Sequence, residues 1–522
     1  MSDGQRYRFG PLERRGLIAG WRGGQIVSVA AGLLVAVAAL RDRSGPAGVA
    51  VAVVAAIGGL AVACWPVAGR TAEEWAPTAV RWCTAGFAGR RHQRVGIPAA
   101  GRCSGLGRSG CGAPCSGSIV RSRSRSVYGE LRIVEVLGAG GDGGADRGVT
   151  PADGDGAAVV ADRRAGTLTA VLRVAGRSFS LLGADEQDRQ VSGWASVLAS
   201  LARERPTVRR LQWVASSLPD DGRAVHDDLA RRAALDEGSA AHRSYRQLLG
   251  LLATGTCRHE VLLAVQVRGR PGRRSGVDDP SAALVREVDA LRRLLGDTDV
   301  EVAGILGRDG LAATFRAAVL PGALDEPSAA AAGRHPRDRQ ALTGPDGRPC
   351  ASAWPWPLAV RTYWDRVQAD GVWQATYWVA EWPRVDVSPD FLAPLLLGSV
   401  RRTVSMVMEP LSPSRAMRQV ERARTADLAD SELRRRGGFL ATARRTREAE
   451  LVLRREAELA DGHASFRFSG YVTVRAATSA GLDEACDATE QAAGQAHLEL
   501  RRLYGDQDRA LLHGLPLCTG LA

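Results

Sequence analysis

The sequence predicts an α+β protein that begins with a two-helix transmembrane hairpin and continues as a cytoplasmic region of two subdomains. Three observations lead to this fold class. Two apolar segments, Ile26–Leu40 and Ala47–Val67, are separated only by Arg41–Pro46 near the amino terminus. Ten arginines, the first at Arg70 and the last at Arg125, follow the second segment. Beyond residue 126, patterns typical of strands and of helices alternate along the chain.

Both apolar segments are expected to cross a membrane. The second is 21 residues long without a charge, which is enough for about 30 Å of hydrocarbon at about 1.5 Å per residue. The first reaches a sufficient length only if Leu17–Trp21 joins it and Arg22 extends its charge to the interface. A cleaved signal peptide is the alternative interpretation, but it would not be followed by a second apolar run.

The arginines around the two segments predict their orientation. The net charge is +3 before the first segment, +1 in the connection and +8 from Arg70 to Arg125. Because basic residues stay on the cytoplasmic side of a membrane, both termini and the bulk of the chain are expected in the cytoplasm. The protein is therefore expected in the plasma (inner) membrane, with its basic stretch against lipid. The residues that flank the spans are Arg15, Arg22, Arg41 and Arg70.

The composition excludes several classes of function. The first 125 residues carry the whole net charge of +12, so residues 126–522 are neutral and direct binding of nucleic acid is not expected. None of the 69 basic residues is a lysine. A Walker A loop, a protein kinase and a Schiff-base enzyme each use a lysine, so the chain has none of these mechanisms in its usual form.

Two short motifs are weak candidates for a cofactor or a metal. Gly138–Gly143 matches the dinucleotide fingerprint, but loop-like sequence follows it where the fingerprint requires a helix. Cys103, Cys111 and Cys115, even with His92, lack the CxxC spacing of a zinc site. No cofactor, metal or catalytic residue is therefore expected, and the chain is interpreted as a protein without enzymatic activity. A nucleotide-binding enzyme that uses the Gly138–Gly143 loop is the alternative from another class.

The chain divides into four parts. Residues 1–70 are assigned to the hairpin, 71–126 to a basic linker, and 127–330 and 350–522 to two cytoplasmic α+β domains. In the first domain, four runs predict a small antiparallel sheet: Leu131–Leu137, Ala157–Val160, Thr167–Val174 and Ser178–Leu182. Further patterns predict helices over Gln187–Arg203, Val225–Gly250 and Pro280–Leu295, and strands over Val208–Ser216 and Glu260–Val267.

The second cytoplasmic domain has the most distinctive sequence. Six of the twelve tryptophans lie within Trp354–Trp382, where Asp370-Gly371 between two strand-like runs predicts a β-hairpin. The tryptophans are interpreted as core residues, with a stacking platform for bases or sugars as the alternative. Strands are also expected over Val400–Pro410 and Phe466–Ala476. Helices are expected from Pro389, over Ser412–Ala426, over Ser431–Leu459 with an interruption at Gly437-Gly438, and over a small-residue seam from Leu482 to Leu503.

Several short blocks resemble parts of conjugation machinery. Tyr7–Leu17, followed by the two apolar segments, resembles the PrgI-type membrane module of type IV secretion systems found in a group of actinobacterial membrane proteins. Blocks of the second cytoplasmic domain are similar to the amino-terminal, non-motor domain of the VirB-type, TraC/TrbE-like conjugation ATPases: Trp378–Pro383, Phe391–Leu396, Arg454–Leu459, Phe468–Val474, and Leu503–Gln507 with Leu515–Leu517. In those ATPases the last block leads into a RecA-like motor, whereas this sequence stops five residues later without a P-loop.

This resemblance implies a structural and docking subunit of a type IV secretion-like, conjugative apparatus that has no motor of its own. The implied partners are membrane lipid, a separate secretion ATPase and other subunits, including further copies of the chain. An EccE-like type VII secretion component is the alternative within the same class, and a peripheral role in nucleic-acid handling is the third hypothesis. The candidate surface for the ATPase is the Arg/Glu-rich face around Arg444, Arg445 and Arg447, with a merely solvated face as the alternative.

Overall fold

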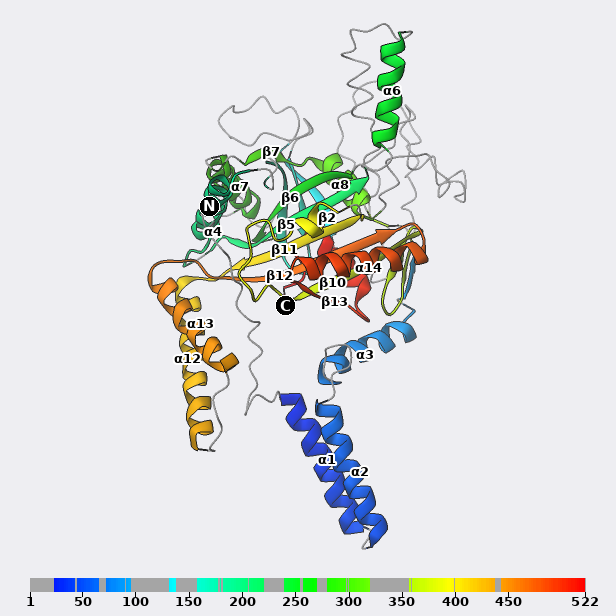
Figure 1. The fold of residues 1–522 in the computed structure, drawn as a ribbon, viewed down its shortest axis with the longest axis vertical. Coiled ribbons are helices and arrows are strands. Elements are labelled where there is room, and N and C mark those ends of the chain that lie inside the picture. Colours follow the sequence, from blue (N-terminus) through cyan, green and yellow to red (C-terminus); the bar gives the residue numbers. More distant parts are fainter. Residues whose placement is uncertain are drawn as a thin grey trace.

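The computed structural model has a large sheet with helices on both faces, and further helices, among them α1 (Gly23–Asp42), α2 (Pro46–Cys64), α12 (Pro413–Arg436) and α13 (Ala443–Ala460), project away from it (Figure 1). This mixture of helix and sheet confirms the coarse fold class. The residues that the structure describes are 23–42, 45–64, 72–89, 91–94, 131–137, 157–176, 179, 182–204, 206–219, 239–253, 257–269, 279–296, 298, 300–319, 356–357, 359–398, 400–436 and 443–521.

Within the described residues, thirteen strands form one sheet, and they pair with one another in antiparallel fashion. Their order is β1-β8-β9-β10-β12-β11-β5-β6-β4-β3-β2, with β13 paired to β10 and β7 paired to β4. The strands are β1 His92–Arg94, β2 Leu131–Leu137, β3 Ala157–Asp162, β4 Thr167–Ala175, β5 Val208–Pro219, β6 Cys257–Arg268, β7 Glu301–Ile305, β8 Ala359–Thr362, β9 Val367–Ala369, β10 Val372–Glu381, β11 Arg402–Pro410, β12 Phe466–Ala476 and β13 Glu499–Arg502.

The sheet joins the two regions that the sequence assigns to separate cytoplasmic domains. Strand β5 belongs to the first region and β11 to the second, and they pair from Leu211 with Met408 to Ser216 with Thr403. The two regions therefore share backbone hydrogen bonds and a continuous core. The division at residues 70, 126, 330 and 350 stays a prediction.

Helices cover the two faces because side chains alternate along each strand. Helices α4, α7 and α14 pack on one face, and α8 with the carboxyl-terminal segment packs on the other. The described helices are α1 Gly23–Asp42, α2 Pro46–Cys64, α3 Ala72–Phe87, α4 Ala184–Leu201, α6 Ala240–Ala253, α7 Pro280–Gly296, α8 Arg308–Val319, α11 Ala393–Leu396, α12 Pro413–Arg436, α13 Ala443–Ala460, α14 Ser479–Gln495, α15 Gln507–Ala510 and the 3₁₀ helix η2 Leu511–Gly514.

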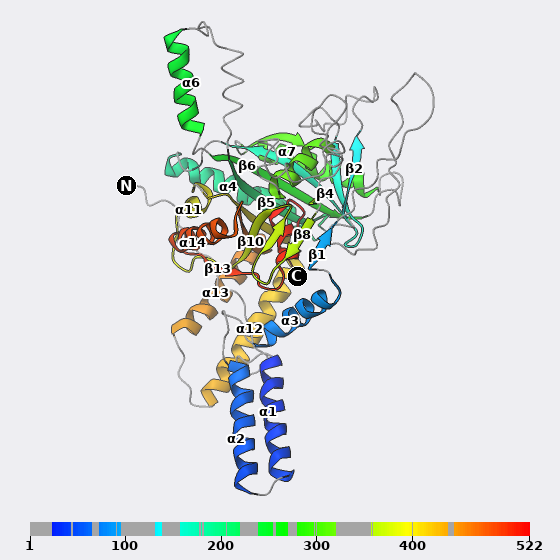
Figure 2. The same ribbon diagram turned by 90° about the vertical axis from the view of Figure 1, so that its right-hand side faces the viewer.

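Helices α1 and α2 lie side by side and project away from the sheet (Figure 2). They approach closely at two glycines: a Cβ on Gly32 would lie 2.9 Å from the Ala55 carbonyl oxygen and 3.0 Å from the Gly59 Cα. Near the sheet, Gln25 Nε2 donates to the Ala63 carbonyl at 2.9 Å. Helix α1 is long and apolar enough to cross a membrane over Gly24–Asp42, whereas the apolar stretch of α2, Pro46–Ala61, is shorter.

The carboxyl-terminal segment lies beneath the sheet, where buried polar side chains satisfy its backbone. Gln212 donates from Nε2 to the His513 carbonyl at 3.0 Å and accepts at Oε1 from the Cys518 N–H at 2.6 Å. Ser405 Oγ donates to the same His513 carbonyl, and Gln266 Nε2 donates to the Leu517 carbonyl. The block Leu515–Leu517 is thus part of the core of the sheet.

The predicted β-hairpin is confirmed. Strands β9 and β10 flank Asp370 and Gly371, whose φ angles of 47° and 96° are those of a tight turn with both central residues left-handed. Strand β12 coincides with the predicted strand Phe466–Ala476. In the first predicted domain, three of the four strands of the predicted small sheet are present as β2, β3 and β4, and they pair antiparallel as expected.

Three predicted elements are wrong in part. The strand expected over Ser178–Leu182 is not formed at its described positions, where the Leu182 N–H donates to the Phe179 carbonyl in a turn. The last helix ends at Gln495 because His497 adopts a left-handed φ of 54°, and Leu500 lies in β13. The gap predicted between the helices Ser412–Ala426 and Ser431–Leu459 is absent. Helix α12 runs without a break from Pro413 to Arg436, because residues 427–430 contain no helix breaker.

Other elements were not predicted or lie partly outside the described residues. Helix α3 and strand β1 fall in the range assigned to a linker, and β7 and α8 were also not expected. Of the helix predicted over Val225–Gly250, the part from Ala240 is present in α6, and residues 225–238 lie outside the described part of the chain.

Candidate coupling site between helix α3 and the sheet

Helix α3 lies between the α1–α2 pair and one end of the sheet (Figure 2). It contacts the turn between β8 and β9 through two tryptophans. Trp75 and Trp82 are seven residues apart and share one face of the helix. Trp364, in the turn between β8 and β9, contacts both. Its ring stacks on Trp75 with 5.6 Å between centroids and meets Trp82 edge-on at 5.4 Å. Tyr504 adds a tilted contact with Trp75 at 5.9 Å.

Charged groups surround this aromatic cluster. Arg81 forms an ion pair with Asp506, which immediately precedes α15. The Arg91 guanidinium lies 4.0 Å from the ring centroid of Trp82, and its Nη2 donates to the Trp82 carbonyl at 2.8 Å. Burial, and then the charge of Arg509, lowers the pKa of Arg81, but the pKa of an arginine is ordinarily so high that the guanidinium stays charged.

Gly505 allows the chain to pass between α3 and Trp364. Its φ of 73° lies in the left-handed region, and its N–H donates to the Trp364 carbonyl at 2.6 Å. A Cβ at this position would lie 2.7 Å from Thr78 Cγ2 and 2.8 Å from the Trp364 ring. Glycine is therefore required here both by the backbone conformation and by the space.

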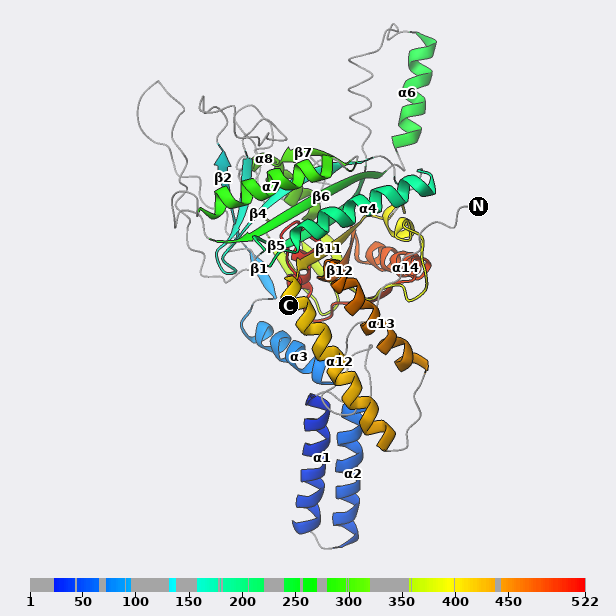
Figure 3. The ribbon, with the colours of Figure 1, turned by 90° about the vertical axis from the view of Figure 1, so that its left-hand side faces the viewer.

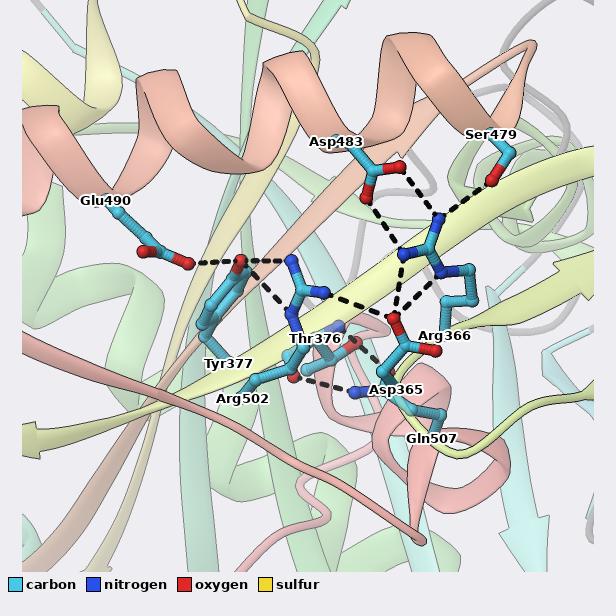
Figure 4. A network of polar contacts seen from close by, with 9 residues as sticks. All are labelled: Asp365, Arg366, Thr376, Tyr377, Ser479, Asp483, Glu490, Arg502 and Gln507. Carbon is cyan, nitrogen blue, oxygen red and sulfur yellow. Dashed lines mark hydrogen bonds and ion pairs between the residues drawn. The ribbon is translucent and has the colours of Figure 1, made fainter. Parts of the chain in front are cut away.

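Behind the aromatic cluster, a polar network ties the Trp364 turn to α14 (Figure 4). Arg366 bridges two carboxylates, with Nη2 at 2.8 Å from Asp365 Oδ2 and 2.8 Å from Asp483 Oδ1. Its Nη1 donates to Ser479 Oγ at 2.8 Å. Arg502, on β13, reaches Asp365 from the other side at 3.3 Å. Burial acts to raise the pKa of Asp365, but the hydrogen bonds and charges of Arg366 and Arg502 outweigh it and lower that pKa.

The network continues through the hydroxyl of Tyr377 (Figure 4). Arg502 Nη2 donates to this oxygen at 2.6 Å, and the hydroxyl donates to Glu490 Oε1 at 2.8 Å. Burial is the main cause that raises the pKa of Tyr377, so the phenol stays protonated. The network thus connects β10, β13 and α14 with one continuous set of hydrogen bonds.

Gln507 fixes the position of α15 next to Asp506. Its Oε1 accepts from the Thr376 N–H at 2.9 Å, and its Nε2 donates to the Thr376 carbonyl at 3.1 Å. The side chain therefore pairs with the backbone of β10 as a neighbouring strand would. This arrangement holds Gly505 and Asp506 rigidly against α3.

The chemistry of the site is that of a connector. Each ionisable side chain drawn in Figure 4 has a charged or hydrogen-bonded partner, and the lowered pKa of Asp365 and raised pKa of Tyr377 keep both groups in the state that these partners favour. Within the described part of the chain, no group of three or more His, Cys, Asp or Glu side chains is placed to hold a metal ion. The geometry suits transmission of position between α3 and the sheet.

The residues predicted from the sequence lie elsewhere or outside the described part. Arg41 is exposed in the last turn of α1, and Arg447 is exposed on α13. Arg444 and Arg445 belong to the first turn of α13, but their side chains are not described. The predicted residues and motifs that lie outside the described residues are Arg15, Arg22, Arg70, Gly138–Gly143, Cys103, Cys111 and Cys115.

Sequence reasoning missed the coupling residues. Trp75, Arg81 and Trp82 stand in the range interpreted as linker, and Asp506 stands in a block noted only for its resemblance. The available signal was the seven-residue spacing of the two tryptophans, which is typical of one helix face. No protein-family model matches the chain, and no curated protein sequence matches it.

Proposed function

We propose that the chain is a membrane-anchored structural subunit of a type IV secretion-like, conjugative apparatus. In this proposal α1 and α2 both cross the plasma membrane, their connection lies outside the cytoplasm, and the sheet lies in the cytoplasm. In this proposal the chain docks a separate secretion ATPase and other subunits.

The observation that carries the proposal is the exposed apolar surface of the α1–α2 pair. Twelve large apolar side chains on these two helices are at least 42% exposed, which suits contact with lipid better than contact with water. They are Val27, Leu33, Leu34, Val35, Val37, Leu40, Val49, Val51, Val53, Val54, Ile57 and Leu60. The glycine contact between Gly32 and Gly59 is of the kind that packs helices in membranes.

The coupling site supports the structural role. Several blocks that resemble the non-motor domain of conjugation ATPases lie in or beside β10 and β12, and Leu503–Gln507 contacts α3 directly. A platform that transmits force or position between a membrane and a cytoplasmic partner requires such a fixed connection. Trp364 and Asp506 provide it in this chain.

Membrane insertion and orientation can be tested together. The full chain should resist extraction from membranes by alkaline carbonate, and a reporter fused after Val120 should be active only as a cytoplasmic reporter. The control is a chain that lacks residues 23–64, which should be extracted. Activity of a cell-surface reporter after Val120 would overturn the orientation, and carbonate release of the intact chain would overturn the anchor.

The protein partner requires a separate measurement. Arg444, Arg445 and Arg447 are the candidate surface, so replacing all three by Glu should reduce co-purification of a co-expressed secretion ATPase, because charge complementarity mainly sets specificity and association rate. The matched control reverses Arg415, Arg418 and Arg422, which are exposed near the sheet end of α12. If both variants are folded and membrane-bound and recover the same amount of ATPase, the arginines of α13 are a solvated face and not the docking surface.

A further inference from the structure

Helices α12 and α13 form a pair that projects from the sheet. In all three ribbon views the pair extends to the side on which α1 and α2 lie (Figures 1–3). Figures 1 and 3 show the end of α12 at the level of the upper part of the α1–α2 pair, and Figure 1 shows it well to one side of that pair. The terminal residues of α12, Arg435 and Arg436, are therefore at the level where the ends of α1 and α2 nearest the sheet would meet a membrane surface.

The positive charge of the pair is concentrated at this free end. Residues 434–447 contain six arginines and no acidic residue. Residues 413–433 contain four arginines and four acidic residues, and residues 448–460 contain two arginines and four acidic residues. Residues 434–447 thus carry a charge of +6, of which +3 lies in the last turn of α12, while the remainder of the two helices carries −2.

The side chains at the end of α12 are open to an outside ligand. The side chains of Arg435 and Arg436 are 77% and 75% exposed, and both pair with a single carboxylate, Glu432. One carboxylate cannot neutralise two guanidinium groups. A positive surface therefore remains at the tip of the pair.

Helix electrostatics explain only half of these arginines. Arginines in the last turn of α12 complement the negative end of the helix dipole, so Arg435 and Arg436 have a local structural reason. Arg444 and Arg445 lie in the first turn of α13, which has no acidic residue and where positive charge opposes the dipole. Arg444 and Arg445 belong to the surface proposed above for the ATPase, so the inference below rests on Arg435 and Arg436 at the end of α12.

We propose that the free end of the α12–α13 pair, centred on Arg435 and Arg436, binds the anionic headgroups of the membrane in which α1 and α2 are anchored. This inference rests on the proposed membrane anchor. It gives the sheet a second attachment to the bilayer, at a distance from the first, and so fixes its tilt relative to the membrane. Guanidinium groups suit the task because they bind phosphate in a bidentate manner.

The test uses the full chain reconstituted in lipid nanodiscs of phosphatidylcholine alone or of phosphatidylcholine mixed with phosphatidylglycerol. Hydrogen exchange of the amides in the last turns of α12 is followed by mass spectrometry. Each arginine at an anionic surface raises the bound population about fivefold, so exchange should be at least about fivefold slower with phosphatidylglycerol. The difference should vanish at 1 M salt, where the Debye length is about 3 Å.

Two variants give the matched comparison. Replacing Arg434, Arg435 and Arg436 together by Gln should abolish the dependence on lipid. Replacing Arg415, Arg418 and Arg422 by Gln removes the same charge from the sheet end of the same helix. This variant should keep the dependence of exchange on lipid.

The outcomes separate this proposal from the proposed function. Equal exchange in the two lipids, with the chain still resistant to carbonate, would overturn the lipid site and leave the anchor intact. Loss of ATPase recovery by the Arg434–Arg436 variant under that same result would assign the arginines to a protein partner. Release of the chain by carbonate would overturn the anchor and the lipid site with it.

Discussion

Removing the Trp364 ring should detach α3 from the sheet while the sheet stays folded. The ring makes two aromatic contacts, with Trp75 at 5.6 Å and with Trp82 at 5.4 Å. Each such pair contributes about 0.5–1.5 kcal/mol beyond its buried area, so Trp364→Ala should cost about 1–3 kcal/mol of α3 attachment. That range corresponds to an equilibrium constant for local opening of α3 that is about 5- to 150-fold larger than in the unaltered chain.

Hydrogen exchange of the α3 amides, measured on the full chain in nanodiscs, reports this opening. Trp378→Ala is the control, since Trp378 lies in β10 and its Nε1 donates to Ser469 Oγ in β12. The control should change exchange in the sheet more than in α3. Unaltered α3 exchange in Trp364→Ala, or an equal change in both variants, would refute the role of Trp364 as the contact that holds α3.

Three further predictions concern the same region and the buried carboxyl-terminal segment. Gly505→Ala should lower the free energy of unfolding by more than the roughly 1–2 kcal/mol of left-handed strain, because the added Cβ also meets Thr78 and Trp364. Gly371→Ala, with a φ of 96° and open space around it, isolates the strain, and equal thermal destabilisation of the two variants would contradict the steric argument. Tyr377→Phe should cost about 1–3 kcal/mol in denaturant unfolding, since Arg502 loses an acceptor and Glu490 a donor, whereas Tyr363→Phe should be close to neutral. Burial, and then the charge of Arg509, lowers the pKa of His513 to about 4, below its ordinary 6.5. On acidification the imidazole of His513 therefore takes up its proton at a higher pH in the unfolded chain than in the folded chain. Its contribution to the free energy of unfolding is fully present above pH 6.5, and about 3 kcal/mol should be lost as the pH falls toward 4. Thermal unfolding as a function of pH should lose this component in His513→Gln, and an unchanged profile would show that His513 does not titrate as inferred.

The elements that the sequence predicted well are those with a strong local cause. An Asp-Gly pair between two strand-like runs favours one turn geometry, and Asp370 and Gly371 adopt it. Strand β12, Phe466–Ala476, matches its predicted bounds because its apolar residues alternate within a long sheet. Helix α1 contains the whole of the predicted apolar segment Ile26–Leu40, because a run of apolar residues without proline favours a helix.

The elements that the sequence missed depend on distant partners. Helix α3 contains Pro77 and lies among arginines, so nothing local marks it as stable. Its tryptophans meet Trp364, which is remote in the sequence. The last predicted helix failed for a related reason: the four- and three-residue spacing continues past Gln495, but His497 reverses the chain and Leu500 pairs with Val379 in the sheet.

By itself, the sequence determined the properties that depend on composition and on neighbouring residues. The apolar character of α1 and α2, the absence of lysine, the turn at Asp370 and the concentration of arginine between residues 434 and 447 can all be read without a fold. The tertiary structure alone decided that β5 and β11 join two predicted domains into one sheet, and that Trp75 and Trp82 meet Trp364. The reason is physical: pairing and packing between distant segments depend on which faces are buried together, and no short window of sequence contains that information.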